Sequence, residues 1–234
     1  MLTFAITTTT KMASLCLFDD IRGVLCEISV EVSKTHSTTI IDQIDKMLEW
    51  SGETLEDINN VVVSIGPGSF TGVRIAIATV KGMFYGRDVS IYVVNELDAL
   101  AYQAIINNTD CYKIISMIDS NKEKIYCSKY EYKKESLNII GEPEVIKLDN
   151  LIDKILNSED NYVLVGDAVI HYKEKILKTI IDRVIMLDDV DLKIKASTLV
   201  KMLRNGELEK VDIYNIRPYY LEKSQAERDR DNNA

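Results

Sequence analysis

The order of strand-like and helix-like segments predicts an α/β fold built from two related lobes. Three strands at 2–7, 13–18 and 23–32 come first, separated by short polar turns, and helices then alternate with strands. A weaker version of the same order follows in the second half of the chain. With 234 residues, of which 46% are apolar, the chain is long enough for one large domain or two small lobes.

The first half of the chain gives the clearest pattern. Apolar and polar residues alternate over 13–18, and β-branched residues recur in 23–32. Apolar residues then follow helical spacing over 38–50, and Gly52 can end this helix. Residues 61–65 form a continuous apolar run, which is typical of a strand buried on both faces.

Strand–helix units complete this half. A helix is predicted at 71–85, a strand at 89–94, and a second helix at 96–107, which Asn95 can cap. Three antiparallel strands that lead into parallel strand–helix units are the pattern of a ribonuclease-H-like lobe.

The second half contains similar elements in a similar order. It is predicted to hold strands at 112–118, 125–132, 137–146 and 162–166 and helices at 149–157, 168–180 and 196–204. We therefore assign residues 1–108 to a first lobe and 109–222 to a second, smaller lobe. The polar tail at 223–234 is expected to be disordered.

Composition favours a cytoplasmic protein without membrane contact. The start of the chain lacks a basic n-region and a cleavage site, and no apolar run approaches the roughly 18–20 residues needed to cross a bilayer. Four widely spaced cysteines are expected to be reduced. The net charge of −9, without a basic stripe, argues against direct, tight binding of nucleic acid.

One glycine-rich segment stands out, Ser-Ile-Gly-Pro-Gly-Ser-Phe-Thr-Gly-Val-Arg at 64–74. Gly66 and Gly68 permit backbone angles that other residues resist, which predicts a tight structural turn from strand into helix. The N-terminus of that helix is a possible phosphate site. However, a Walker loop needs Gly-Lys before Ser/Thr, and no lysine occurs here until Lys81. A dinucleotide loop needs its third glycine three places after the second, whereas Gly72 lies four after Gly68. The structural turn is the favoured interpretation.

Residues for metal binding or nucleophilic catalysis are sparse. His36 and His171 are the two histidines, far apart in sequence, and a transition-metal site usually needs several converging ligands. Ser69 and Thr71 have no candidate base nearby in sequence. We therefore assign no catalytic, cofactor-binding or metal-binding residue.

The helix at 71–85 carries two apolar arcs at 100° per residue. The first is an adequate core face: Val73, Ile77, Val80 and Phe84. The second is small and apolar: Gly72, Ile75, Ala76, Thr79 and Met83. Because a surface helix needs only one apolar stripe, this helix is either enclosed within the domain or forms an interface with a partner protein.

The glycine-rich string also resembles the signature of a family. Gly-Pro-Gly-Ser-Phe-Thr-Gly-Val-Arg-Ile is similar to the motif of the TsaB (YeaZ) family, bacterial proteins of tRNA threonylcarbamoyladenosine synthesis. The resemblance covers nearly the full chain and continues through 76–82, Thr35-His36-Ser37, 119–126, Gly166-Asp167-Ala168 and Arg217-Pro218-Tyr219-Tyr220.

This resemblance implies a two-lobed fold of the actin, Hsp70 and sugar-kinase superfamily. It also implies a non-catalytic, cofactor-free subunit that activates TsaD, which transfers threonylcarbamoyl to the adenosine beside the anticodon. TsaE, an ATPase, is the implied third partner, and tRNA contact would be indirect. The second arc would then bind TsaD together with the helix at 38–50, and would form a homodimer when the partner is absent.

The sequence departs from the family at the end of the first strand. The family commonly has Ile-Asp-Thr-Ser-Thr there, whereas this chain has threonines from Thr7 to Thr10. In the superfamily that Asp serves Mg²⁺-phosphate, and a threonine lacks the charge a hard cation prefers. Asp119-Ser120-Asn121 also replaces the family's Asp-Ala-Arg. The alternatives are an ATP-dependent phosphotransferase, which needs that Asp, and a metallopeptidase-like hydrolase, which needs a histidine pair.

Overall fold

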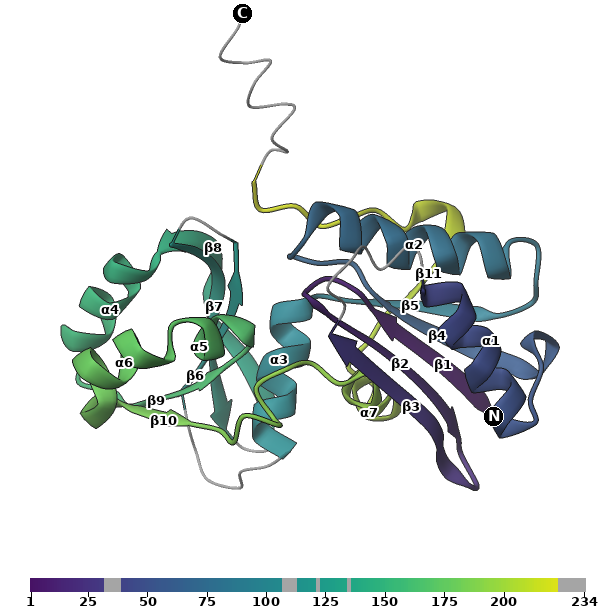
Figure 1. The fold of residues 1–234 in the computed structure, drawn as a ribbon, viewed down its shortest axis with the longest axis horizontal. Helices are drawn as coiled ribbons and strands as arrows, with labels where there is room; N and C mark the ends of the chain where they lie inside the picture. The colour runs from purple at the N-terminus through teal and green to yellow at the C-terminus, as the bar shows by residue number, and fades with distance from the viewer. Residues whose placement is uncertain (32–38, 107–112, 121–122, 134–135, 223–234) are drawn as a thin grey trace, which may run out of the picture.

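The computed structural model describes residues 1–31, 39–106, 113–120, 123–133 and 136–222, which form two sheets flanked by helices (Figure 1). The first sheet has six strands: β1 Leu2–Thr7, β2 Met12–Asp19, β3 Gly23–Glu31, β4 Ile58–Ser64, β5 Ser90–Val94 and β11 Lys210–Val211. Their order is β11-β5-β4-β1-β2-β3. β2 pairs antiparallel with both β1 and β3, whereas β4 and β5 continue from β1 as parallel strands.

Alternating side chains on the first sheet make two cores. Phe4 and Ile6 on β1 face one side, where helices α1 (Ile40–Ser51) and α2 (Phe70–Phe84) cover the sheet. Ala5 faces the opposite side, where α7 (Ala196–Arg204) packs on β1 and β2. The sheet is therefore covered on both faces, as expected for a mixed sheet with parallel strands at its centre.

The second sheet repeats this plan. Its strands are β6 Lys113–Asp119, β7 Lys124–Lys133, β8 Ser136–Lys147, β9 Tyr162–Val165 and β10 Val184–Met186, in the order β10-β9-β6-β7-β8. Three helices lie in its outer core: α4 Leu148–Leu156, α5 Asp167–His171 and α6 Lys173–Ile180. Short 3₁₀ turns complete the chain: η2 Leu55–Asp57, η3 Ile181–Arg183 and η4 Ile213–Asn215.

Both halves thus run through three antiparallel strands, a helix and a parallel strand, which confirms the predicted α/β class and the ribonuclease-H-like order. The predicted helix at 168–180 is two helices, α5 and α6, which meet at Tyr172. The strands β10 and β11 were not predicted, because they have only three and two residues and carry no periodic signal.

The chain returns to the first lobe after completing the second sheet. Helix α7 packs on β1 and β2, and β11 pairs with β5 at the edge of the first sheet. The predicted boundary placed all of 109–222 in the second lobe. Since α7 is separated from its packing partners by most of the chain, its helical pattern cannot reveal which sheet it covers.

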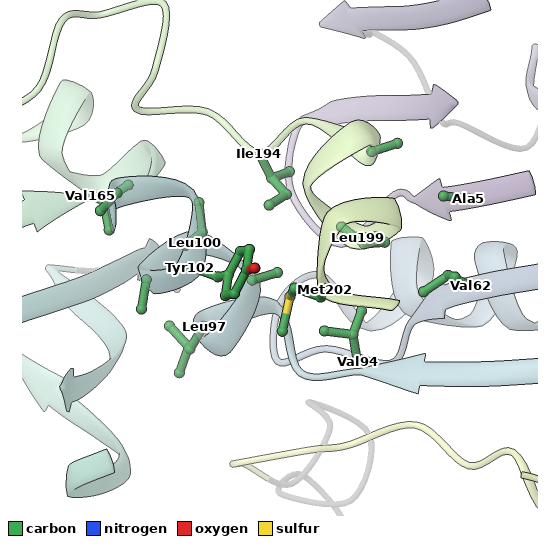
Figure 2. Packing of buried hydrophobic residues seen from close by; sticks show 14 of the residues in the cluster. Ala5, Val62, Val94, Leu97, Leu100, Tyr102, Val165, Ile194, Leu199 and Met202 are labelled. Atoms are coloured by element: carbon green, nitrogen blue, oxygen red, sulfur yellow. The ribbon is translucent and has the colours of Figure 1, made fainter. Parts of the chain in front are cut away.

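The two lobes share one apolar core around α3 (Glu96–Ile106). Figure 2 shows Leu97, Leu100 and Tyr102 of α3 between Val165 of the second sheet and Val94 of the first. This shared core fixes the lobes against each other.

Some sequence features fall outside the described residues. These are the Thr35-His36-Ser37 motif, Cys111 and the tail at 223–234. Within the ranges that the structure describes, no helix is both long enough and apolar enough to cross a membrane.

Candidate partner interface and the glycine turns of the two lobes

The glycine-rich turn joins β4 to α2 and packs against the turn that follows β1. Gly66 and Gly68 have positive φ angles, +103° and +158°. A Cβ placed on Gly68 would lie 2.3 Å from the carbonyl oxygen of Thr9, which already accepts a 2.6 Å hydrogen bond from the Ser69 N–H. Backbone from two separate strands therefore meets here without room for a side chain.

Several groups of the first turn of α2 are bonded within the chain. Ser69 caps the helix by accepting from the Gly72 N–H at 3.3 Å. Thr8 Oγ1 donates to the Gly72 carbonyl at 2.7 Å, and a Cβ on Gly72 would lie 1.9 Å from the Thr8 carbonyl oxygen. The helix N-terminus thus faces its own neighbouring turn, which favours the structural interpretation over a phosphate loop.

The inner face of α2 is the core arc expected from the sequence. All four of its residues are buried: Val73, Ile77, Val80 and Phe84. They pack with β1, where the Phe84 and Phe4 ring centroids are 6.1 Å apart.

The second predicted arc divides in the structure. Gly72 and Ala76 are buried in the first lobe, so they offer no surface to a partner. Ile75, Thr79 and Met83 are partly exposed. The helical wheel treats α2 as isolated and could not include the Thr8–Thr9 turn, which covers the N-terminal end of this arc.

A strip of small residues on α2 was missed by the sequence reasoning. Its exposed members are Thr71, Ala78 and Gly82. A Cβ on Gly82 would meet nothing within 4 Å, so the helix surface is open there. We use "outer face of α2" for these three residues together with Ile75, Thr79 and Met83.

Aromatic residues from the end of the chain border this outer face, because the C-terminal segment runs beside α2 (Figure 1). Tyr214 meets Tyr85 edge-on, with ring centroids 5.7 Å apart. Tyr220 stacks on Phe70 at 4.6 Å and accepts a 2.8 Å hydrogen bond from Arg74 Nε.

Helix α1 covers the same face of the sheet as α2. Ile40, Ile44 and Met47 are buried in the core that both helices share. On its outer side Trp50 is 69% exposed and Ile41 47%. Both helices therefore have apolar groups available for contact on the side away from the sheet.

The threonine at the end of β1 contacts a carboxylate that comes from helix α3. Thr7 Oγ1 donates to the Glu96 carboxylate and lies 3.0 Å from both of its oxygens. Glu96 is fully buried, and its backbone N–H donates to the Gly66 carbonyl at 2.8 Å. Burial raises the pKa of Glu96, against the lowering effect of hydroxyls from Ser64, Thr9 and Thr7.

Sequence reasoning treated Glu96 only as the start of a helix. The sequence nevertheless indicates that Glu96 lies near Thr7. Glu96 follows β5 almost directly, and the parallel strands β1, β4 and β5 have their carboxyl ends at the same end of the sheet. A charged residue just beyond any of these strands is therefore expected near Thr7.

The second lobe has a related turn after β9. Gly166 has a φ of +114°, and a Cβ there would lie 2.0 Å from the Met117 carbonyl oxygen. Asp167 Oδ1 accepts from the Asp119 N–H at 3.0 Å. Burial raises the pKa of Asp167 to about 6, and the charge of Asp119 adds to this effect.

His171 lies near Asp119. Its Nδ1 is 3.8 Å from Asp119 Oδ2, and the hydroxyl of Tyr172 donates to the same carboxylate at 3.3 Å. No group of three or more potential metal ligands comes together among the residues that the structure describes.

Comparison with known proteins agrees with this arrangement. The family model "TsaD: tRNA N6-adenosine threonylcarbamoyltransferase" matches residues 16–229. The protein named "tRNA threonylcarbamoyladenosine biosynthesis protein TsaB" from Buchnera aphidicola is 29% identical over 154 residues, which cover 65% of this chain and 70% of that protein. Its namesake from Bacillus subtilis is 24% identical over 205 residues, or 87% of each chain.

Solved structures share the fold. YeaZ from Pseudomonas aeruginosa has a TM-score of 0.72 at 21% identity and covers 94% of this chain and 99% of its own. A ROK family protein from Streptococcus pneumoniae has a TM-score of 0.50 at 10% identity, covering 88% and 99%. With a family model that spans most of its length and relatives that share one name, this chain belongs to the TsaB (YeaZ) family of tRNA threonylcarbamoyladenosine biosynthesis proteins.

Proposed function

We propose that this chain is a non-catalytic subunit that binds and activates a TsaD-like threonylcarbamoyl transferase. A TsaE-like ATPase is the third member of the proposed assembly, and tRNA contact occurs through the partners. The observation that supports the proposal is that Thr7 lies where the resemblance implies an Asp for Mg²⁺-phosphate, and its hydroxyl is bonded to the buried Glu96.

Contacts near the two turns are consistent with this view. The Gly72 N–H at the start of α2 is bonded to Ser69. At the end of β1 Thr7 is bonded to Glu96, and after β9 the Asp167 side chain accepts from a backbone N–H. Glu96 is fully buried, so its carboxylate is not accessible to a phosphate or a metal ion.

The outer face of α2, beside α1, is the proposed partner surface. Thr71, Ala78 and Gly82 have small side chains, so the backbone of a partner helix can approach closely. Apolar contact is supplied by Ile75, Thr79 and Met83. The same surface is proposed to pair with a second copy of the chain when the partner is absent.

The test is a charge on the outer face. Ala78→Arg should leave the fold intact, because Ala78 is exposed, and should lower affinity for a TsaD-family partner by at least about 100-fold, since a bulky cation would be desolvated in the contact. Calorimetric titration measures the affinity, and size-exclusion chromatography measures the homodimer. Thr179→Arg on the exposed side of α6 is the control and should change neither.

A ligand screen separates this proposal from its rivals. Melting temperature should not change with ATP-Mg²⁺, as a phosphotransferase would require, or with Zn²⁺, as a metallopeptidase would require. The non-catalytic role would be refuted if either ligand raised the melting temperature and a single substitution at Thr7, Glu96 or Asp167 abolished that increase.

A further inference from the structure

The end of the described chain touches both lobes within four residues. Residues 219–222 leave the side of α2 and reach the β6–β7 hairpin of the second lobe. The α3 core joins the lobes through apolar contacts, and this segment is a second connection between them.

The first-lobe end of the segment is fixed by backbone and ring contacts. The Tyr219 N–H donates to the Ile65 carbonyl at 2.8 Å, and the Tyr219 carbonyl oxygen approaches Gly66 so closely that a Cβ there would be 2.8 Å away. The Tyr220 ring lies between Phe70, on which it stacks, and Arg74, whose guanidinium carbon is 5.7 Å from the ring centroid. This end is therefore attached to both the glycine-rich turn and α2.

The second-lobe end is fixed by charge. Glu222 accepts from Lys124 Nζ at 2.9 Å and from Ser120 Oγ at 3.4 Å. The Glu222 side chain is only 16% exposed, so solvent screens this ion pair less than a fully exposed one. Ser120 directly follows Asp119, whose backbone N–H donates to the Asp167 carboxylate.

We propose that residues 219–222 form a clasp that couples the surface of α2 to the position of the β6–β7 hairpin. Arg74 and Tyr220 are both exposed beside the outer face of α2, so a protein that binds there contacts the clasp directly. Tyr220 and Glu222 are two residues apart, and an extended chain spans at most about 3.3–3.6 Å per residue. Because the chain between them has little slack, a displacement of Tyr220 also displaces Glu222. The regulatory use of the clasp rests on the proposed function, whereas the coupling is a property of the chain alone.

The coupling is tested by amide hydrogen exchange on the full chain without a partner. Arg74→Gln removes the guanidinium from Tyr220 and should raise exchange at the start of β7, on the other lobe, by about twofold to fivefold. Glu222→Gln removes the anchor itself and should raise exchange there by a similar factor. Exchange in β9 should stay constant in both variants, which separates a local effect from general unfolding.

Arg87→Gln is the matched control. Arg87 follows the other end of α2 and has one ion pair, to Glu56 at 2.9 Å, with no contact to the clasp. It should leave exchange at the start of β7 unchanged. The proposal is overturned if Arg74→Gln has no effect at β7, if Glu222→Gln has none, or if Arg87→Gln has the same effect as Arg74→Gln.

A second measurement adds an excess of a TsaD-family partner. Binding should change exchange at the start of β7 in the wild-type chain and should do so at least twofold less in Arg74→Gln. If the partner fails to bind the wild-type chain, the proposed function fails, while the partner-free experiment still decides the clasp. If it binds and exchange at β7 is unchanged, the regulatory use of the clasp is refuted.

Discussion

The two lobes contain the same turn with different contents. Gly72 in the first turn of α2 and Gly166 directly after β9 each pass so close to a neighbouring segment that a Cβ would collide with a carbonyl oxygen, at 1.9 Å for Gly72 and 2.0 Å for Gly166. The first turn is filled by hydroxyl and backbone groups and leads into the 15-residue helix α2. The second is filled by the carboxylate of Asp167 and leads into the five-residue helix α5.

This comparison distinguishes features that the fold of both lobes requires from features that occur in one lobe only. Close backbone contact occurs in both turns, so it belongs to the shared architecture. A long helix with an open outer side follows only the first turn. The second turn carries its own carboxylate, Asp167, whereas Glu96 contacts the first turn from helix α3. The first turn thus leads to the surface that we propose for a partner, and the second positions an ionisable group beside Asp119.

The largest change in unfolding free energy is expected at the two glycines that lie closest to a carbonyl oxygen. Gly72→Ala and Gly166→Ala should each lower the free energy of unfolding by more than about 3 kcal/mol, because the carbonyl oxygens they meet belong to backbone that cannot move aside. Urea unfolding measures both. A small loss for one variant and a large loss for the other would show that the turns are not equivalent.

A second test concerns the carboxylate at the edge of the first sheet. Thr7→Asp restores the residue that the family commonly has, but it places a second buried carboxylate against Glu96. We expect a loss of about 2–3 kcal/mol in unfolding free energy. The double variant Thr7→Asp/Glu96→Ser removes the repulsion and should recover most of this loss. If the single variant is as stable as the wild type, a second carboxylate is tolerated beside Glu96 and the predicted repulsion is absent.

The third test uses the titratable group of the second turn. Because burial raises the pKa of Asp167 to about 6, the folded state holds this proton more tightly than the unfolded state does. Its contribution to stability is complete below about pH 4 and is lost as pH rises through about 6. Asp119 and Glu96 are its acidic neighbours, and Lys11 acts in the opposite direction.

The variant Asp167→Asn isolates this contribution. Relative to the wild type, its unfolding free energy should rise by about 1–2 kcal/mol between pH 4 and pH 7. Denaturant titrations at several pH values provide the measurement. A difference that is constant with pH would mean that Asp167 ionises normally in the fold.

The smallest effect is expected on the outer face of α2. Gly82 lies in a helix, and added atoms would meet nothing within 4 Å, so Gly82→Ala should stabilise the chain by about 0.5–1 kcal/mol. The contrast with Gly72→Ala, in the same helix, is the sharpest form of the comparison. Destabilisation by Gly82→Ala would mean that this face is not open.

Much of the fold was predictable because it depends on local patterns. The inner residues of α2 repeat with helical spacing, and both glycine turns occur where a strand pattern changes to a helix pattern. The predicted arc failed at Gly72 and Ala76, because their burial comes from tertiary neighbours that a helical wheel does not include. Glu96 was missed because it is separated from Thr7 by 89 positions, and only the sheet order brings them together.

The pairing of Thr7 with Glu96 also limits how this chain can change. Introducing an acidic residue at position 7 is unfavourable while Glu96 remains, and losing Glu96 first removes the carboxylate that accepts from the buried Thr7 hydroxyl. Either single mutation toward an acidic position 7 therefore passes through a less stable protein. Positions 7 and 96 are thus epistatic, because a change at one is tolerated better once the other has changed.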